Sequence, residues 1–235
     1  MNTEMMGALG HPQARDEAIY ERVFDAILEQ RLAPGTRLSE DKLGQVFGVS
    51  RTIVRKVLQR LEHEGVVEIH RNRGASVAST TAQQARQVFA ARRVIERAVV
   101  TEACGCISQS GLLHLRAIIA AEQDAIHHQD RGRALRLSGE LHLRLADACG
   151  NGFLAGFARS LVSRCSLVIA QYETHASPLC STDEHAQILD AIAAGDSALA
   201  VALMDEHISH IENKLSLSDD VPTLDLADIF FKETT

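Results

Sequence analysis

The spacing of apolar residues predicts helices along most of the chain, and the first two lie within the N-terminal 50 residues. An apolar stripe that begins after Asp16 has members four positions apart, as on one face of an amphipathic helix: Ile19, Val23 and Ile27. Pro34 ends this helix, because proline disfavours helical geometry at the residue before it. Ser39 is a suitable N-cap for a second, shorter helix, which Gly48 ends.

The third predicted helix separates its residues into two faces. Ser50 can cap its start, and Gly65 supplies its end. The face expected to be buried carries four aliphatic residues: Val54, Val57, Leu58 and Leu61. Another face carries three polar residues one turn apart: Arg51, Arg55 and Gln59. Two β-prone runs follow, 66–70 and 75–77, and the basic segment between them predicts a hairpin with a basic tip.

Beyond residue 80 the pattern is helical throughout. Short breaks separate six amphipathic segments: 83–104, 111–127, 132–149, 152–172, 184–194 and 197–215. Short connections between helices of this length favour an antiparallel bundle. We therefore expect a mainly α protein with a winged helix-turn-helix domain over 15–79 and an antiparallel all-helical bundle over 83–215. Residues 1–14 are expected to be disordered, and residues 216–235 form an acidic tail.

Composition agrees with a helical protein that buries a sizeable core. Hydrophobic residues make up 46% of the 235 positions and aromatic residues only 4%, and there is no tryptophan. The net charge of −7 is unevenly divided, because residues 1–78 carry 11 basic and 11 acidic residues whereas residues 79–235 carry 13 and 20. Between Arg51 and Arg73 there are six basic residues and three acidic ones. Such a local positive patch is what attraction to phosphate requires.

Cysteine usage and the lack of targeting segments indicate the compartment. No two of the five cysteines form a CxxC pair, so neither a disulfide framework nor a zinc knuckle is expected: Cys104, Cys106, Cys149, Cys165 and Cys180. The first 15 residues lack the apolar core of a signal peptide. No stretch approaches the roughly 20 apolar residues of a membrane-spanning helix. We expect a cytoplasmic protein with no membrane partner.

The order helix, helix, turn, helix and basic hairpin is typical of a winged helix. Such a domain places its third helix in the DNA major groove, with the first residues of that helix nearest the bases. Arg51 and Arg55 can each bind guanine O6 and N7, while Ser50 and Thr52 suit phosphate contacts. Two wing arginines can reach the minor groove or the sugar-phosphate backbone: Arg71 and Arg73. The alternative for each arginine is a solvated, salt-bridged face, but the joint arrangement favours DNA binding.

Five segments of the N-terminal domain carry a family resemblance: Pro34–Glu40, Val49–Arg55, Leu58–Glu62, Glu64–Val67 and Asn72–Ala75. Residues 17–78 resemble the winged helix-turn-helix of the GntR superfamily of bacterial regulators, and specifically its FadR subfamily. The resemblance implies DNA-holding roles for residues at the start of the third helix: Ser50, Arg51, Thr52 and Arg55. The expected DNA-binding set is completed by Arg37, Arg71, Arg73 and Gly74, the last of which allows a tight turn in the wing. The family usually has proline where this chain has Ile53, so the entry of the helix can differ slightly.

The C-terminal half resembles the helical FCD ligand-binding domain of the same subfamily. The matching residues are 92–96, 141–142, 150–151, 184–185, 190–192, 195–196, 204 and 207–208. Three histidines lie on three different predicted helices: His142, His185 and His207. Antiparallel packing of the last two helices would bring His185 and His207 to one level, although a chance cluster is the alternative in a chain with 11 histidines. Metal-binding members of the family use histidines at these places, which implies a divalent transition metal of the Zn, Ni or Mn class.

Ser138 is a departure from the family pattern. Metal-binding members usually have aspartate at this position, four residues before the first histidine, and a neutral hydroxyl is a poor ligand for a dication. A three-histidine site completed by water or effector, a weakened site and no metal at all therefore stay open. Arg92 resembles the family arginine that lines the ligand cavity, and the alternative is a salt bridge with Glu96 one turn along. Arg92 and Ser138 are the expected effector-binding residues.

These patterns predict a homodimeric transcriptional regulator that binds a pseudo-palindromic, double-stranded DNA operator. A small, anionic metabolite in the helical domain is expected to control operator affinity through its preference for one of two conformations. The alternative is a metal-responsive regulator in which the ion itself is the signal. An enzyme that activates water on three histidines is not expected, because no general base lies beside them in the sequence and the DNA-binding half would have no use.

Overall fold

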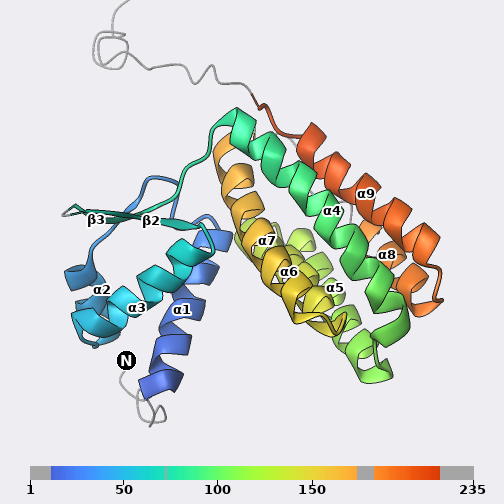
Figure 1. Ribbon diagram of the computed structural model, residues 1–235, viewed down its shortest axis with the longest axis horizontal. Coiled ribbons are helices and arrows are strands. Elements are labelled where there is room, and N and C mark those ends of the chain that lie inside the picture. Colours follow the sequence, from blue (N-terminus) through green and yellow to red (C-terminus); the bar gives the residue numbers. More distant parts are fainter. Residues whose placement is uncertain (1–11, 72, 174–182, 218–235) are drawn as a thin grey trace, which may run out of the picture.

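The computed structural model describes residues 12–71, 73–173 and 183–217, which fold into two lobes (Figure 1). The smaller lobe combines helices with a small sheet, and the larger lobe is a helical bundle. This is the mainly α, two-part architecture predicted from the sequence. Residues 1–11 and most of the expected acidic tail, from residue 218, lie outside the described residues.

The smaller lobe is a winged helix-turn-helix. Its elements are α1 (Pro12–Leu28), β1 (Arg37–Leu38), α2 (Glu40–Phe47), α3 (Arg51–His63), β2 (Val67–His70) and β3 (Gly74–Val77). The antiparallel sheet has the order β1-β3-β2, in which Ala75 lies between Leu38 and Ile69. The β2–β3 hairpin is confirmed. Strand β1 was not predicted, because two residues are too few to show an alternating pattern.

The first helix differs from its prediction at both ends. It begins at Pro12 instead of near Asp16. Proline suits the first turn of a helix, where its missing N–H would have no partner. The helix ends at Leu28, well before Pro34, because Gln30 adopts a left-handed conformation with φ of 59°.

The caps and the buried face of the next two helices follow the sequence. The Ser39 hydroxyl accepts a hydrogen bond from the Lys42 backbone N–H, and Gly48 ends α2 with φ of 64°. Ser50 occupies the N-cap position of α3 but makes no side-chain cap bond. The four aliphatic residues predicted to be buried are at most 4% exposed: Val54, Val57, Leu58 and Leu61. Helix α3 therefore packs against α1 and α2 and turns its polar face outward.

The larger lobe is the predicted bundle. Its helices are α4 (Ala82–Cys106), α5 (Gln109–His127), α6 (Arg131–Ala148), α7 (Gly152–Tyr172), α8 (Glu184–Ala193) and α9 (Ser197–Asn213), all within two residues of the predicted bounds. Thr81 and Gln84 form a capping box at the start of α4. Helix α4 packs against α6, α7, α8 and α9, so it lies at the centre of the contacts of the bundle.

Helix α7 is more apolar than expected. By length and composition it could cross a membrane, with a mean hydropathy of 1.4. The prediction that no stretch approaches this apolar character was therefore wrong for α7. In the fold it packs against α4 and α6, and 44% of its most apolar window is buried. Packing in the bundle accounts for this part of its apolar character.

The two lobes share a packed boundary. Leu143, Val162 and Leu167 of the bundle join the hydrophobic core of the smaller lobe. The Ser160 hydroxyl of α7 donates a hydrogen bond to the Glu64 carbonyl at 3.1 Å. Helices α6 and α7 therefore pack directly against the winged helix-turn-helix lobe.

Candidate functional site: the DNA-reading surface and the histidine cluster

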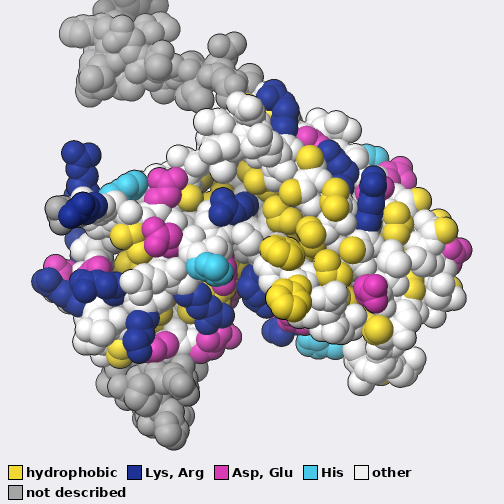
Figure 2. Space-filling model, in the orientation of Figure 1, with side chains coloured by type: hydrophobic (Ala, Val, Ile, Leu, Met, Phe, Trp, Pro, Cys, Tyr) yellow, Lys and Arg dark blue, Asp and Glu magenta, His cyan; other side chains and the backbone are white. Residues whose placement is uncertain are grey.

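A groove runs between α3 and the wing formed by β2 and β3. The polar residues that line it are Arg37, Ser39, Glu40, Asp41, Arg51, Arg55, Gln59, His70, Arg71, Arg73 and Gly74. Six of the eight expected DNA-binding residues are therefore together in the groove. The other two, Ser50 and Thr52, are exposed at the start of α3. Figure 2 shows Lys and Arg side chains gathered over this lobe.

Both arginines expected to read bases are paired with carboxylates of α2. Arg55 donates to Glu40 through two bonds, Nε to Oε1 at 3.0 Å and Nη2 to Oε2 at 2.8 Å. Arg51 pairs with Asp41. The salt-bridged face considered as the alternative is therefore present. The side chains of Arg51 and Arg55 are nevertheless 69% and 58% exposed, which leaves them accessible to a duplex.

Backbone atoms of the wing make contacts with strand β1. Gly74 has φ of 86°, a left-handed conformation that glycine adopts without steric cost. The Arg37 guanidinium on β1 donates to the Arg73 carbonyl at 3.4 Å. Arg71 and Arg73 are exposed at the tip. The wing arginines therefore project from a braced hairpin.

Three histidines meet inside the bundle, one from each of α6, α8 and α9. The Nε2 atom of His207 lies 3.2 Å from Nε2 of both His142 and His185. The nitrogen atoms able to bind a metal all lie within 4.8 Å of one another. All three residues are buried. Antiparallel packing of α8 and α9 brings His185 and His207 to one level, which the spacing had suggested.

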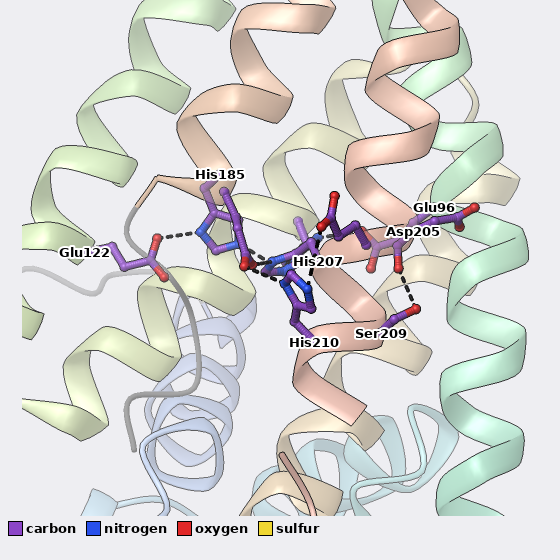
Figure 3. A network of polar contacts seen from close by, with 10 residues as sticks. Glu96, Glu122, His185, Asp205, His207, Ser209 and His210 are labelled. Atoms are coloured by element: carbon purple, nitrogen blue, oxygen red, sulfur yellow. Dashed lines mark hydrogen bonds and ion pairs between the residues drawn. The ribbon is translucent and has the colours of Figure 1, made fainter. Parts of the chain in front are cut away.

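Each histidine presents its other ring nitrogen to a carboxylate, and Figure 3 shows this for His185 and Glu122. The Nδ1 contacts are His142 to Glu96 at 2.5 Å, His185 to Glu122 at 2.7 Å and His207 to Glu184 at 2.8 Å. A neutral imidazole whose Nδ1–H donates to a carboxylate carries its lone pair on Nε2. The three carboxylates therefore turn all three Nε2 lone pairs toward one point.

Burial keeps at least two of the histidines neutral at physiological pH. Burial lowers the pKa of His142 to about 4, although Glu96 opposes this shift. Burial, together with the neighbouring His185, lowers the pKa of His207 to about 3. Neutral imidazole is the form that ligates a metal.

Two of the carboxylates around the cluster stay ionised. Burial opposes this, but Arg92 and His142 hold the pKa of Glu96 well below its usual range. Burial also opposes ionisation of Glu184, and hydrogen bonds from two histidines lower its pKa to about 2. Glu122 is 4% exposed and lies against His185. Glu96 and Glu184 therefore place negative charge beside the histidines, and the Arg92 guanidinium offsets part of it.

The expected effector-binding residues line a small cavity beside the cluster. Arg92, Ser138, His142, Cys165 and Ser166 contribute its polar lining, and its volume is about 20 Å³. Arg92 donates through Nε to Glu96 at 2.5 Å and through Nη1 to the Cys165 sulfur at 3.1 Å. The salt bridge with Glu96 considered as the alternative is therefore present, and Arg92 still reaches the cavity.

Five acidic residues of these sites were not predicted. The sequence patterns assigned no role to Glu40 and Asp41 in the groove, and none to Glu96, Glu122 or Glu184 at the histidines. Their partners lie on other elements, so spacing along one helix gives no signal of them. His210 lies outside the cluster, because its side chain is 45% exposed, although it contacts Glu184.

Comparison with known proteins identifies both lobes. Residues 15–77 match the profile of bacterial regulatory proteins of the gntR family, and residues 87–210 match that of the FCD domain. The chain belongs to the GntR family of bacterial regulatory proteins. This GntR regulator is 30% identical to the transcriptional regulator LutR of Bacillus subtilis, over 79% of its own length and 94% of LutR. It is 25% identical to the transcriptional repressor RspR of Escherichia coli K12, over 88% and 91% of the two chains.

Solved structures confirm the fold of the regulator. Escherichia coli McbR/YncC superposes with a TM-score of 0.75 over 85% of this chain and 95% of the other, at 17% identity. A GntR-type transcriptional regulator from Rhodococcus sp. RHA1 gives a TM-score of 0.69 over 85% and 96%, at 24% identity. The matched domains and relatives are those of transcriptional regulators, so this chain is a transcriptional regulator and not an enzyme.

Proposed function

We propose that this GntR regulator, a cytoplasmic member of the FadR subfamily, binds a pseudo-palindromic operator as a homodimer. A ligand site in the FCD domain controls operator affinity. The site is built on a divalent transition metal held by His142, His185 and His207, and the effector is a small anionic metabolite. The observation that carries the metal proposal is the convergence of three Nε2 atoms whose Nδ1 atoms are all occupied by carboxylates.

The distances in the cluster suit a metal ion. Two unprotonated Nε2 atoms 3.2 Å apart repel one another, so a proton or a cation has to lie between them. Two nitrogen ligands at roughly 2.1 Å from one tetrahedral ion lie roughly 3.4 Å apart, close to that spacing. The negative charge of Glu96 and Glu184 beside the cluster favours a cation there. Outer carboxylates thus supply the charge that an aspartate in place of Ser138 would have supplied.

The surroundings of the cluster support an anionic effector. A three-histidine site leaves a coordination position for water or a carboxylate. Arg92 and Ser138 line the adjacent cavity, and a guanidinium can donate hydrogen bonds to such a group. A metabolite needs more room than the cavity has, because about 20 Å³ holds about one water molecule. Binding therefore requires movement of the surrounding helices.

The small cavity also favours the second candidate function. The cavity has room for one metal-bound water without rearrangement, so the ion alone could be the signal. In that case DNA affinity would respond to metal in the absence of any organic ligand.

The cavity wall supports a route to the DNA-binding lobe. Val162 and Gly139 line the cavity, and Val162 also belongs to the core of the smaller lobe. A Cβ atom added to Gly139 would lie 3.7 Å from the Leu28 side chain of α1. One layer of residues therefore separates the cavity from the first helix of the winged domain. A ligand that moves α6 or α7 would move this helix with them.

An exposed apolar face supports the homodimer. Phe153 and Phe157 on α7 are 85% and 59% exposed, and Val94 on the adjacent α4 is 63% exposed. Figure 2 shows hydrophobic side chains gathered over α4 and α7. Pairing of this face with the same face of a second copy about a two-fold axis would cover it, and such a dimer would present two winged domains to the two halves of a palindrome.

One experiment tests DNA binding and the metal together. Duplexes from upstream of the regulator's own gene are titrated at fixed salt with protein stripped by a chelator, with added zinc chloride, and with zinc plus a panel of small carboxylates. Arg55→Ala is expected to weaken binding to the preferred duplex roughly 5- to 100-fold without changing the dimer, because it removes a base contact. His185→Ala is expected to lose bound zinc in elemental analysis.

The outcomes separate the parts of the proposal. Failure of the wild-type protein to prefer any upstream duplex contradicts operator binding. Equal zinc content in His185→Ala and wild type contradicts the metal site. A full response to zinc without a carboxylate favours the metal-responsive alternative.

A further inference from the structure

The two carboxylates of the DNA-reading groove are placed at particular arginines. Glu40 and Asp41 open α2 and reach across to Arg55 and Arg51 on α3. Within the described part of the chain, the other groove arginines form no ion pair with a carboxylate: Arg37, Arg71 and Arg73. The two carboxylates of the groove therefore lie beside Arg51 and Arg55, the arginines expected to read bases.

The geometry of the Glu40–Arg55 pair leaves one edge of the guanidinium free. Glu40 accepts from Nε and Nη2, so the edge formed by Nη1 and the second Nη2 hydrogen faces away from the carboxylate. That edge is the one that can give two parallel bonds to guanine O6 and N7. The pair restricts a long side chain that would otherwise sample many rotamers. Arg55 is held before DNA arrives.

The same carboxylates oppose non-specific binding. A duplex of any sequence is held mainly by attraction between basic residues and phosphates. A carboxylate beside a guanidinium cancels much of that attraction at a distance, because the two charges nearly balance. The Arg55 side chain keeps the pKa of Glu40 below its usual range through their hydrogen bonds, so Glu40 stays ionised at neutral pH.

We propose that Glu40 is a positioning residue that aims Arg55 at a base edge, and that Glu40 and Asp41 together weaken binding to non-operator DNA. They thereby set the preference of the winged helix-turn-helix lobe for operator DNA over other DNA. The inference rests on the proposed function, since it takes Arg55 to be a base-reading residue. Direct contact of Glu40 with DNA is not required.

The test compares one selected duplex with one scrambled duplex. The selected duplex comes from a random-sequence library enriched on the wild-type full-length protein, and both affinities are measured by fluorescence anisotropy at several salt concentrations. Four variants are compared with wild type: Glu40→Gln, Arg55→Ala, the double variant and Asp41→Asn. Asp205→Asn is the matched control, because Asp205 makes an equally exposed two-bond pair with Arg97 in the bundle.

Glu40→Gln is expected to lower the ratio of selected to scrambled affinity by roughly 5- to 100-fold, the range that one arginine–base contact supplies. Its affinity for the scrambled duplex stays equal or rises. Adding Glu40→Gln to Arg55→Ala produces no further loss of the ratio, because Glu40 acts through Arg55. Asp41→Asn raises affinity for the scrambled duplex, and Asp205→Asn changes neither affinity.

Several results would overturn the inference. An unchanged ratio in Glu40→Gln, or an equal loss with and without Arg55, removes the positioning role. A parallel fall in both affinities with a lower melting temperature assigns Glu40 a structural role instead. An unchanged scrambled affinity in Asp41→Asn removes Asp41 from the proposal. Failure of the wild type to enrich any sequence contradicts the proposed function itself, and is therefore distinguishable.

Discussion

At the scale of single residues, the main feature of this regulator is the pairing of each cluster histidine with one carboxylate. The pairs fix the ring nitrogen that carries the proton and supply negative charge without supplying a direct ligand. The carboxylates come from positions 46, 63 and 23 residues away from their histidines. Sequence spacing can identify the histidines as candidates, but only the packing of α4, α5 and α8 shows their partners.

Glu122→Gln is expected to weaken zinc binding about 10- to 100-fold, because the amide cannot accept the His185 Nδ1–H with a full negative charge. Competition with a chromophoric chelator measures the affinity. Glu102→Gln, an exposed change on α4, is the matched control and leaves zinc affinity unchanged. Equal affinities of the two variants would contradict a role for the outer carboxylate.

At the scale of elements, α3 shows how far an apolar pattern can be trusted. Its buried residues recur at helical spacing, so the pattern was correct along the whole helix. Strand β1 shows the limit, because its two residues form a strand only by pairing with β3, more than 30 residues later. The local pattern of apolar residues predicts an element when the residues of that element define a buried face. It does not predict a strand such as β1, which forms only because a distant strand pairs with it.

Leu61→Ala in α3 is expected to destabilise the winged domain by about 2–5 kcal/mol, because Leu61 is fully buried and its loss leaves a cavity. Urea unfolding followed by circular dichroism measures the change, since the chain has no tryptophan for fluorescence. Lys56→Ala, an exposed change on the same helix, should stay within about 0.5 kcal/mol of wild type. A similar effect of both variants would show that the buried face of α3 is not what stabilises the domain.

At the scale of the whole molecule, α7 carries three surfaces. Cys165 and Ser166 line the cavity beside the histidines, Leu167 packs into the winged domain, and Phe153 and Phe157 are exposed. One rigid helix thus joins the proposed ligand site, the reading head and the proposed dimer face. A shift of α7 would therefore move residues of the ligand site, of the boundary with the winged domain and of the dimer face together.

Phe157→Asp is expected to convert the proposed dimer to a monomer without loss of helix content, because a charge on an exposed apolar face is tolerated in the monomer and buried unpaired in the dimer. Light scattering after size-exclusion chromatography measures the mass. Leu113→Asp, at a 60% exposed position on α5, is the matched control and should remain dimeric. A wild-type monomer, or a dimer of Phe157→Asp, would contradict the proposed face.

The sequence by itself determined the helices, the division into two lobes and the residue types available for DNA and metal, because those properties depend on local periodicity and composition. Tertiary structure alone decided which side chains meet. Glu40 reaches Arg55, Glu122 reaches His185, and three imidazoles from separate helices converge only when the helices pack. Such contacts depend on the relative placement of elements far apart in the chain, which no pattern within a single element records.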